Sequence, residues 1–109
     1  MPYNAPRTTI KKDYFAVEFD APEADPRAFL IELSGDTLYI RGRYLGDGVG
    51  VRFSLYSRGG GKIDTTYNIP VPVTDDSRYL EATYADGVLR FYFRRADEYS
   101  ERRTKIYLR

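Results

Sequence analysis

The sequence predicts an all-β protein, an antiparallel β-sandwich of about seven short strands. Apolar and polar residues alternate over short segments, and clusters of glycine, proline and aspartate separate these segments at regular spacing. Such alternation places every second side chain on a core. Eleven tyrosines and six phenylalanines among 109 residues also favour strands, because aromatic side chains pack well on a pleated surface.

Residues 80–93, LEATYADGVLRFYF, predict a β-hairpin with Asp86-Gly87 as its turn. A two-residue type I′ turn needs positive φ at both positions, which glycine adopts freely and aspartate adopts better than most residues. A slip of one residue would bury charged side chains, so we expect the pairing to be strongly specified. The predicted pairs on the apolar face are Tyr84 with Leu89, Ala82 with Phe91, and Leu80 with Phe93.

The N-terminal part divides into an arm and a strand. Residues 1–12 contain two prolines and no clear periodicity, so we expect an extended arm whose Ile10 reaches the sheet. Residues 13–19 then alternate, with Phe15, Val17 and Phe19 on the side that faces the core. Two prolines follow and force a turn.

The middle of the chain predicts three more strands. Residues 29–33 place Phe29, Ile31 and Leu33 on one face, and residues 37–43 complete a second hairpin after a Ser-Gly-Asp turn. Residues 63–69 form the next strand, which ends before a proline that cannot donate to a ladder.

Residues 44–62 predict a long loop, because they hold six glycines around one short alternating segment. We expect an exposed strand at residues 49–56 within this loop. A loop of this length in a compact domain indicates function or pairing with another chain. Two interpretations remain open, namely strand exchange with a second copy and an ordinary hairpin covered by its own loop.

The C-terminal segment, residues 96–109, is highly charged and ends with Ile106, Tyr107 and Leu108 before the last arginine. Two apolar residues spaced by two point the same way from an extended chain, which suits adjacent pockets along a sheet edge. A strand of the chain's own domain or a frayed end are the alternatives. The mixed signs of charge favour a solvated linker, and we do not expect nucleic-acid binding.

Composition excludes several classes of function. The chain has no cysteine and no histidine, which rules out disulfides, thiolate zinc sites and catalysis by either residue. The formal net charge of +1 gives no global field to attract nucleic acid or an anionic membrane. Since no segment approaches the ~20 apolar residues that cross a bilayer, we expect a cytoplasmic protein that is not an enzyme and uses no cofactor or metal.

Residues 82–89, ATYADGVL, resemble the A-x-x-x-[ND]-G-V-L signature of α-crystallin domains in small heat-shock proteins. Residues 20–22 (DAP) look like the D-L-P of that family, and residues 35–42 (GDTLYIRG) look like its G-x-x-L-x-I-x-G hairpin. Residues 66–70 (TYNIP) are similar to its aromatic-R-L-P segment. The resemblance spans about residues 13–94, and Glu23 stands where the family usually has glycine.

The resemblance implies an immunoglobulin-like sandwich of the α-crystallin type at residues 13–95, between a short arm at 1–12 and a charged extension at 96–109. It implies an ATP-independent chaperone, or holdase, that binds partly unfolded client proteins, limits their aggregation and associates with itself as a dimer or small oligomer. The residues implied to act are Phe29, Ile31, Leu80 and Ala82 as a client-binding groove, Ile106 and Leu108 as a docking motif for that groove, and Val51, Phe53 and Leu55 as a dimerisation strand.

The short arm also fits a second interpretation. The related CS-domain co-chaperones share the sandwich, lack a capturing arm and dock one partner. An adaptor or co-chaperone module with one specific protein partner is therefore the alternative function. An enzyme is the third hypothesis, and the sequence offers no recognisable nucleophile arrangement for it.

Overall fold

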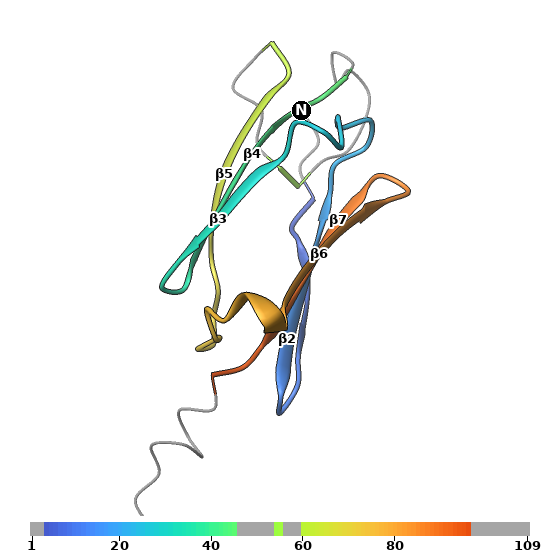
Figure 1. The fold of residues 1–109 in the computed structure, drawn as a ribbon. Coiled ribbons are helices and arrows are strands. Elements are labelled where there is room, and N and C mark those ends of the chain that lie inside the picture. Colours follow the sequence, from blue (N-terminus) through green and yellow to red (C-terminus); the bar gives the residue numbers. More distant parts are fainter. Residues whose placement is uncertain (1–3, 46–53, 56–59, 97–109) are drawn as a thin grey trace, which may run out of the picture.

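The computed structural model describes residues 4–45, 54–55 and 60–96, and within them it shows two antiparallel sheets packed face to face (Figure 1). One sheet has the strand order β1-β2-β7-β6 and the other has the order β3-β4-β5. The all-β sandwich predicted from the sequence is confirmed. The elements are β1 (Arg7–Ile10), β2 (Tyr14–Asp20), β3 (Leu30–Ser34), β4 (Thr37–Arg43), β5 (Lys62–Asn68), the 3-10 turn η1 (Ser77–Tyr79), β6 (Leu80–Ala85) and β7 (Val88–Arg94).

The β6–β7 hairpin forms with the predicted turn and register. Asp86 has φ 52° and Gly87 has φ 75°, as a type I′ turn requires. Tyr84 pairs with Leu89, Ala82 with Phe91, and Leu80 with Phe93. The turn packs on the connection between β2 and β3, where the N–H of Ala21 donates to the carbonyl oxygen of Gly87 at 2.8 Å.

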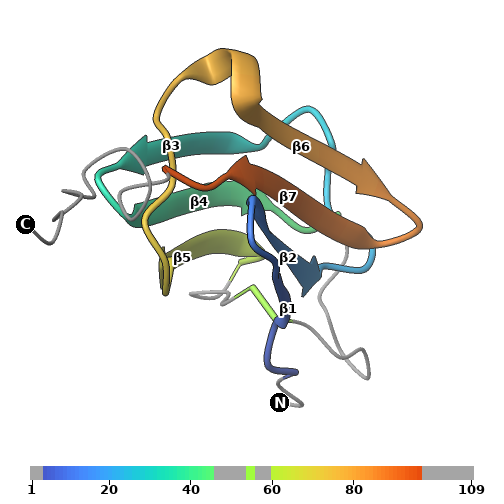
Figure 2. The same ribbon diagram turned by 90° about the horizontal axis from the view of Figure 1, so that it is seen from below.

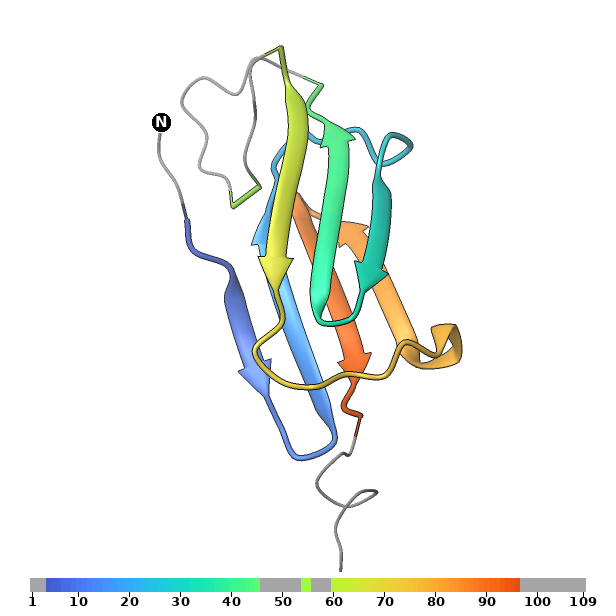
Figure 3. The same cartoon turned by 90° about the vertical axis from the view of Figure 1, so that its left-hand side faces the viewer.

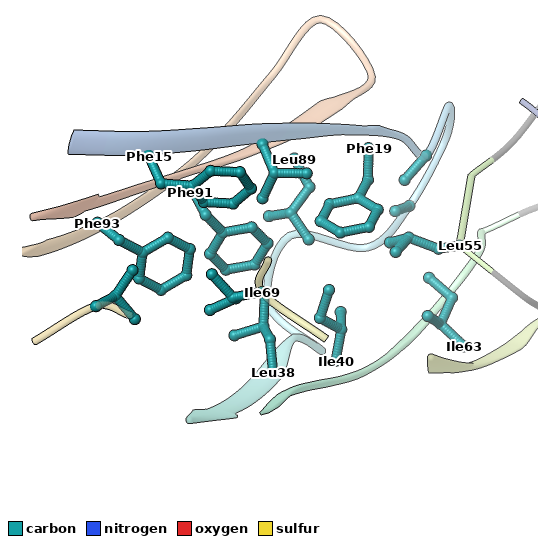
Figure 4. Close-up of a cluster of buried hydrophobic side chains, with 14 of the residues drawn as sticks. Phe15, Phe19, Leu38, Ile40, Leu55, Ile63, Ile69, Leu89, Phe91 and Phe93 are labelled. Atoms are coloured by element: carbon teal, nitrogen blue, oxygen red, sulfur yellow. The ribbon is translucent and has the colours of Figure 1, made fainter. Parts of the chain in front are cut away.

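The core lies between the two sheets and is lined by aromatic and aliphatic side chains of both (Figure 4). The predicted inward face of β2 is confirmed, since Phe15, Val17 and Phe19 are fully buried. Phe19 also meets Phe91 of β7 edge to face, with ring centroids 5.9 Å apart. The remaining buried strand residues are Ala16 of β2, Leu38 and Ile40 of β4, Ile63 of β5, and Leu89 and Phe93 of β7.

Gly42 on β4 makes room for the ring of Phe29, which lies just before β3. A Cβ atom at Gly42 would stand 3.0 Å from Cδ1 of Phe29 and 3.6 Å from Cδ1 of Ile63. Because real Cβ atoms seldom come this close to another atom, a side chain at Gly42 would displace Phe29. The glycine therefore allows Phe29 to pack against the core.

Strand β1 was not predicted, and it lies within the segment expected to be an extended arm. It pairs with β2 through four residues, from Arg7 opposite Glu18 to Ile10 opposite Phe15. All four of its side chains are exposed, and Ile10 is 52% exposed. Ile10 thus reaches the sheet through its backbone, without burying its side chain.

Residues 54–55 correct the expectation of an exposed strand at 49–56. Leu55 is fully buried and lies at one end of the core, near Phe19 and Ile63 (Figure 4). Its carbonyl oxygen accepts a hydrogen bond from the hydroxyl of Tyr44 at 3.0 Å. The neighbouring Ser54 is buried too, and its N–H donates to the carbonyl oxygen of Asp20 at 2.6 Å. This part of the long loop is therefore fixed to its own domain.

Glu23 adopts the left-handed conformation, with φ 59°. This is the position where the resemblance expects glycine, the residue that adopts positive φ without steric cost. The carbonyl oxygen of Glu23 accepts the N–H of Leu45 at 2.7 Å, so the strained residue also joins the connection between β2 and β3 to the end of β4.

Candidate functional site at the open edge of the sandwich

Strands β3 and β6 are the outer strands of their sheets on the same side of the sandwich (Figures 2 and 3). In the described part of the chain each of them pairs with one neighbour only, β3 with β4 and β6 with β7. The outward N–H and C=O groups of an edge strand can pair with an added strand. We refer to this pair of strands and their inward apolar side chains as the β3/β6 edge.

The side chains of the β3/β6 edge are apolar and only partly covered. Ile31 and Leu33 of β3 and Leu80 of β6 pack against the core and remain partly accessible. Ala82 lies on the same face of β6 and is exposed. Leu30 points away from the core and is 55% exposed, as the alternation of β3 predicts. An extended segment placed here would therefore meet apolar surface beside unpaired backbone.

The ring of Tyr84 closes one end of this edge. It lies 5.3 Å from the ring of Phe29, measured between centroids, and the two rings join β6 to the start of β3. The Tyr84 hydroxyl donates to the carbonyl oxygen of Ala21 at 2.6 Å and accepts the N–H of Ala24 at 3.0 Å. These bonds fix the ring, so the accessible part of β6 lies between Leu80 and Tyr84.

The structure brings the four predicted groove residues to one edge. Phe29 lies just before β3 and Ile31 lies on it. Leu80 and Ala82 lie on β6. Sequence reasoning left out Leu33 and Tyr84, although the alternation of Ile31 and Leu33 and the apolar face of the hairpin both pointed to them. The hairpin patterns could not show that β3 and β6 border the same side of the sandwich.

The other predicted site residues lie elsewhere. Leu55 is in the core of its own domain, which makes its side chain unavailable to a partner subunit. Val51, Phe53, Ile106 and Leu108 lie outside the described residues. Their proposed roles in dimerisation and docking therefore remain predictions.

The outer face of the four-stranded sheet holds a hollow lined by aromatic and charged side chains, among them Asp13, Tyr79, Tyr92 and Arg94. Its rings already have partners, since Tyr92 stacks on Tyr14 at 4.9 Å between centroids and the Arg94 guanidinium lies 4.5 Å from the Tyr79 ring centre. Because both signs of charge line it and its rings are in use, this hollow is a weaker candidate than the β3/β6 edge.

The chemistry available at the β3/β6 edge is non-covalent. Its side chains are apolar or aromatic, and residues 4–45, 54–55 and 60–96 contain no group of three or more histidine, cysteine, aspartate or glutamate residues that could hold a metal ion. Burial raises the pKa of Tyr44 and of Tyr67, so both phenols stay neutral. No helix in the described part of the chain is long and apolar enough to span a membrane.

No family model matches this sequence, and no curated protein matches it significantly. The structure, by contrast, is similar to heat shock protein 16.0 from Schizosaccharomyces pombe, with a TM-score of 0.68 and 17% identity over 98% of this chain and 76% of that one. HSP18.5 from E. histolytica is similar with a TM-score of 0.66 and 13% identity, over 100% of this chain and 97% of that one. The hspA protein from Xanthomonas axonopodis is similar with a TM-score of 0.59 and 25% identity, over 84% of this chain and 94% of that one. These likenesses show that the chain has the α-crystallin β-sandwich fold.

Proposed function

We propose that this chain, whose fold is the β-sandwich of small heat-shock proteins, is an ATP-independent chaperone that binds partly unfolded proteins and limits their aggregation. The observation that carries this proposal is the β3/β6 edge, where two edge strands border one strip of partly covered apolar side chains. An unfolding protein exposes apolar side chains and unpaired backbone together, and this edge can accept both.

The proposed mechanism needs no catalytic residue. A client segment in extended conformation adds to β3 or β6 by main-chain hydrogen bonds and places alternate side chains against Ile31, Leu33 and Leu80. Backbone bonds and shallow apolar contacts discriminate little between sequences, so we expect modest affinity and a broad choice of clients. The adaptor alternative is less favoured, because the solved structures similar to this chain are small heat-shock proteins.

Self-association is the second part of the proposal. Ile106 and Leu108 would dock on the β3/β6 edge of a neighbouring subunit and compete there with clients. Val51 and Phe53 would belong to a strand that pairs with another copy. We place the activity in the cytoplasm, which stays a prediction from the sequence.

The first experiment measures light scattering from a heat-aggregating enzyme such as citrate synthase. The wild-type protein should lower the scattering, and Ala82→Lys should lose part of this effect because it places a charge on the apolar strip. Ala85→Lys is the matched control, since Ala85 is exposed on the opposite face of the same strand. No suppression at several-fold molar excess of wild type would refute the chaperone. Equal suppression by both variants would refute the β3/β6 edge as its site.

The second experiment measures mass in solution by light scattering behind a sizing column. A version that ends at Arg103 should form a smaller species than the full chain if Ile106 and Leu108 dock on a neighbour. Identical masses for the two versions would refute the docking motif and would leave the test on clients unaffected.

A further inference from the structure

Strand β1 is attached to the sheet without contributing to the core. All four of its side chains are exposed, and of the described residues that form the core none comes from β1. Figure 3 shows β1 beyond the outline of the three-stranded sheet, which leaves its inner face uncovered by that sheet. The strand is therefore held by backbone pairing with β2 and by polar side-chain contacts.

The polar contacts gather at the free end of β1. The Arg7 guanidinium donates to both carboxylate oxygens of Asp20, at 2.9 and 3.0 Å, and its Nε donates to Glu18 at 3.3 Å. Asn4 Nδ2 donates to Asp20 at 2.9 Å. These bonds hold the pKa of Asp20 below its usual value, with Arg7 as the largest cause. We call this set of contacts the Asp20 latch.

The other end of β1 is a hinge at the turn into β2. The N–H of Lys11 donates to the carbonyl oxygen of Tyr14 at 2.9 Å, and Arg95 Nη1 donates to the carbonyl oxygen of Lys11 at 2.9 Å. If the Asp20 latch opens, β1 can leave the sheet while it stays connected at this turn. Edge segments with exposed side chains and few apolar contacts have the lowest local stability in a domain.

Strand β2, the neighbour of β1 in the sheet, carries apolar residues opposite most of β1. Phe15, Ala16 and Val17 of β2 are buried, and the partners of these residues in β1 are Ile10, Thr9 and Thr8. Departure of β1 would turn β2 into an edge with unpaired backbone beside apolar side chains. The register of β1 shows what this edge accepts, namely an extended segment that runs antiparallel to β2.

We infer that β1 is a detachable strap, that the Asp20 latch holds it closed, and that β2 accepts an extended segment of a partly unfolded client in its place. This inference rests on the proposed chaperone function. The strap competes at the high effective concentration of a tethered segment. A client with an apolar residue opposite Val17 gains a contact that Thr8 does not make. Weakening the latch should therefore raise client binding, and locking the strap should lower it.

The first test measures hydrogen exchange of the β1 amides in the native protein. These amides should exchange faster than those of the central strand β7, and Arg7→Ala should accelerate them by roughly fivefold, the effect of losing an exposed ion pair. Arg90→Ala is the matched control, because Arg90 contacts Glu18 at 3.5 Å from β7, and β2 separates β7 from β1 in the sheet. Protection of the β1 amides equal to that of β7 would overturn the strap.

The second test locks the strap with a disulfide. Thr9 and Ala16 face each other across β1 and β2, and the chain has no cysteine of its own, so Thr9→Cys with Ala16→Cys can form one defined bond. The oxidised and reduced forms share one sequence and serve as each other's control. The probe is fluorescently labelled, reduced and carboxymethylated α-lactalbumin, and the readout is its anisotropy.

We expect the oxidised form to bind this probe several-fold more weakly than the reduced form, with the β3/β6 edge supplying the residual binding. Equal binding by the two forms would overturn the inference and leave the chaperone function standing. Absence of binding by the wild type and both forms would refute the chaperone function and the client that we assign to β2. Hydrogen exchange would in that case still decide whether the strap opens.

Discussion

The β1–β2 and β6–β7 hairpins lie at opposite edges of the same sheet and are anchored differently. Strand β6 places Leu80 and Tyr84 against the core, whereas every side chain of β1 is exposed. Both strands have a full backbone ladder with their neighbours. Main-chain pairing therefore makes a strand, while buried side chains decide how firmly an edge strand stays attached.

The sandwich consequently has two kinds of edge. The β3/β6 edge is open as it stands, because nothing in the described residues pairs with its outer side. The β2 edge is covered by β1, whose side chains are all exposed.

The largest contrast is between apolar side chains on the two hairpins. Phe91→Ala should lower the free energy of unfolding by about 3–5 kcal/mol, because Phe91 is buried and its removal leaves a cavity. Ile10→Ala on β1 should cost less than about 0.5 kcal/mol, because this side chain is already half exposed. Urea unfolding of both variants measures the difference. Similar costs would contradict the contrast.

The turn of the β6–β7 hairpin offers the next test. Gly87→Ala should cost about 2 kcal/mol, because φ is 75° and the new Cβ would lie 3.2 Å from Cα of Pro22. Gly35→Ala in the β3–β4 turn should cost about 1 kcal/mol, since φ is 60° there but no atom lies within 4 Å. Thermal unfolding compares the two. Equal losses would show that the contact with Pro22 adds nothing.

The hydroxyl of Tyr84 joins the β6–β7 hairpin to the connection between β2 and β3. Tyr84→Phe should lower the free energy of unfolding by about 1.5 kcal/mol, because the carbonyl oxygen of Ala21 and the N–H of Ala24 both lose their bond to the hydroxyl and keep only their mutual bond at 3.3 Å. Tyr39→Phe is the control, since Tyr39 is 40% exposed. Denaturant unfolding that shows no difference between the two variants would contradict this role.

The Asp20 latch should respond to pH. The pKa of Asp20 is lowered in the folded protein from its ordinary value of 3.8. The stability that the Asp20 latch contributes is therefore full above pH 3.8 and is lost as the pH falls through the lower pKa of the folded state. Near neutral pH, hydrogen exchange should give a free energy of opening of the β1 amides that is about 1 kcal/mol higher in wild type than in Asp20→Asn. This gap should close at strongly acidic pH.

The pH measurement has a defined set of neighbours. Among residues 4–45, 54–55 and 60–96, the side chains that bond to the Asp20 carboxylate are Arg7 and Asn4, and Glu18 shares Arg7 with it while Arg90 contacts Glu18. The pKa of Arg7 is raised by its bonds to Asp20 and Glu18, so Arg7 stays protonated and the measurement follows the Asp20 carboxylate. A gap between wild type and Asp20→Asn that persists at acidic pH would contradict the latch.

The smallest effect is a stabilisation. Glu23→Gly should raise the free energy of unfolding by about 0.5 kcal/mol. Glycine removes the steric cost of φ 59°, but it loses more backbone entropy on folding, which offsets part of this gain. Thermal unfolding should show a small increase in the midpoint. A decrease would mean that the Glu23 side chain contributes more than its backbone costs.

The elements that the sequence predicted well are those whose side chains divide cleanly between core and solvent. The register of β6–β7 was predicted because a slip would have buried charge, and the bounds of β4 match the predicted 37–43 because Leu38 and Ile40 alternate with exposed residues. Strand β1 was missed for the converse reason. Its four side chains are all exposed, so no alternation between apolar and polar residues marks it.

The site was only partly predictable. Alternation identified which faces of residues 29–33 and 80–85 are apolar, and the structure then placed those faces at one edge. That placement depends on which strands are outermost in each sheet, a long-range property that local patterns do not contain. Leu55 was assigned to an exposed strand because a short alternating segment stands between the glycines of its loop, yet it is fully buried.

The pairing of β2 with β7 has a consequence for how the protein is made. Tyr14 pairs with Arg94, so the central contact of the larger sheet joins segments about eighty residues apart. During synthesis β2 therefore leaves the ribosome long before its partner exists, and its apolar face must wait while the β3–β4 hairpin can already close. A protein proposed to protect others from aggregation thus passes through an interval in which its own β2 is the exposed segment.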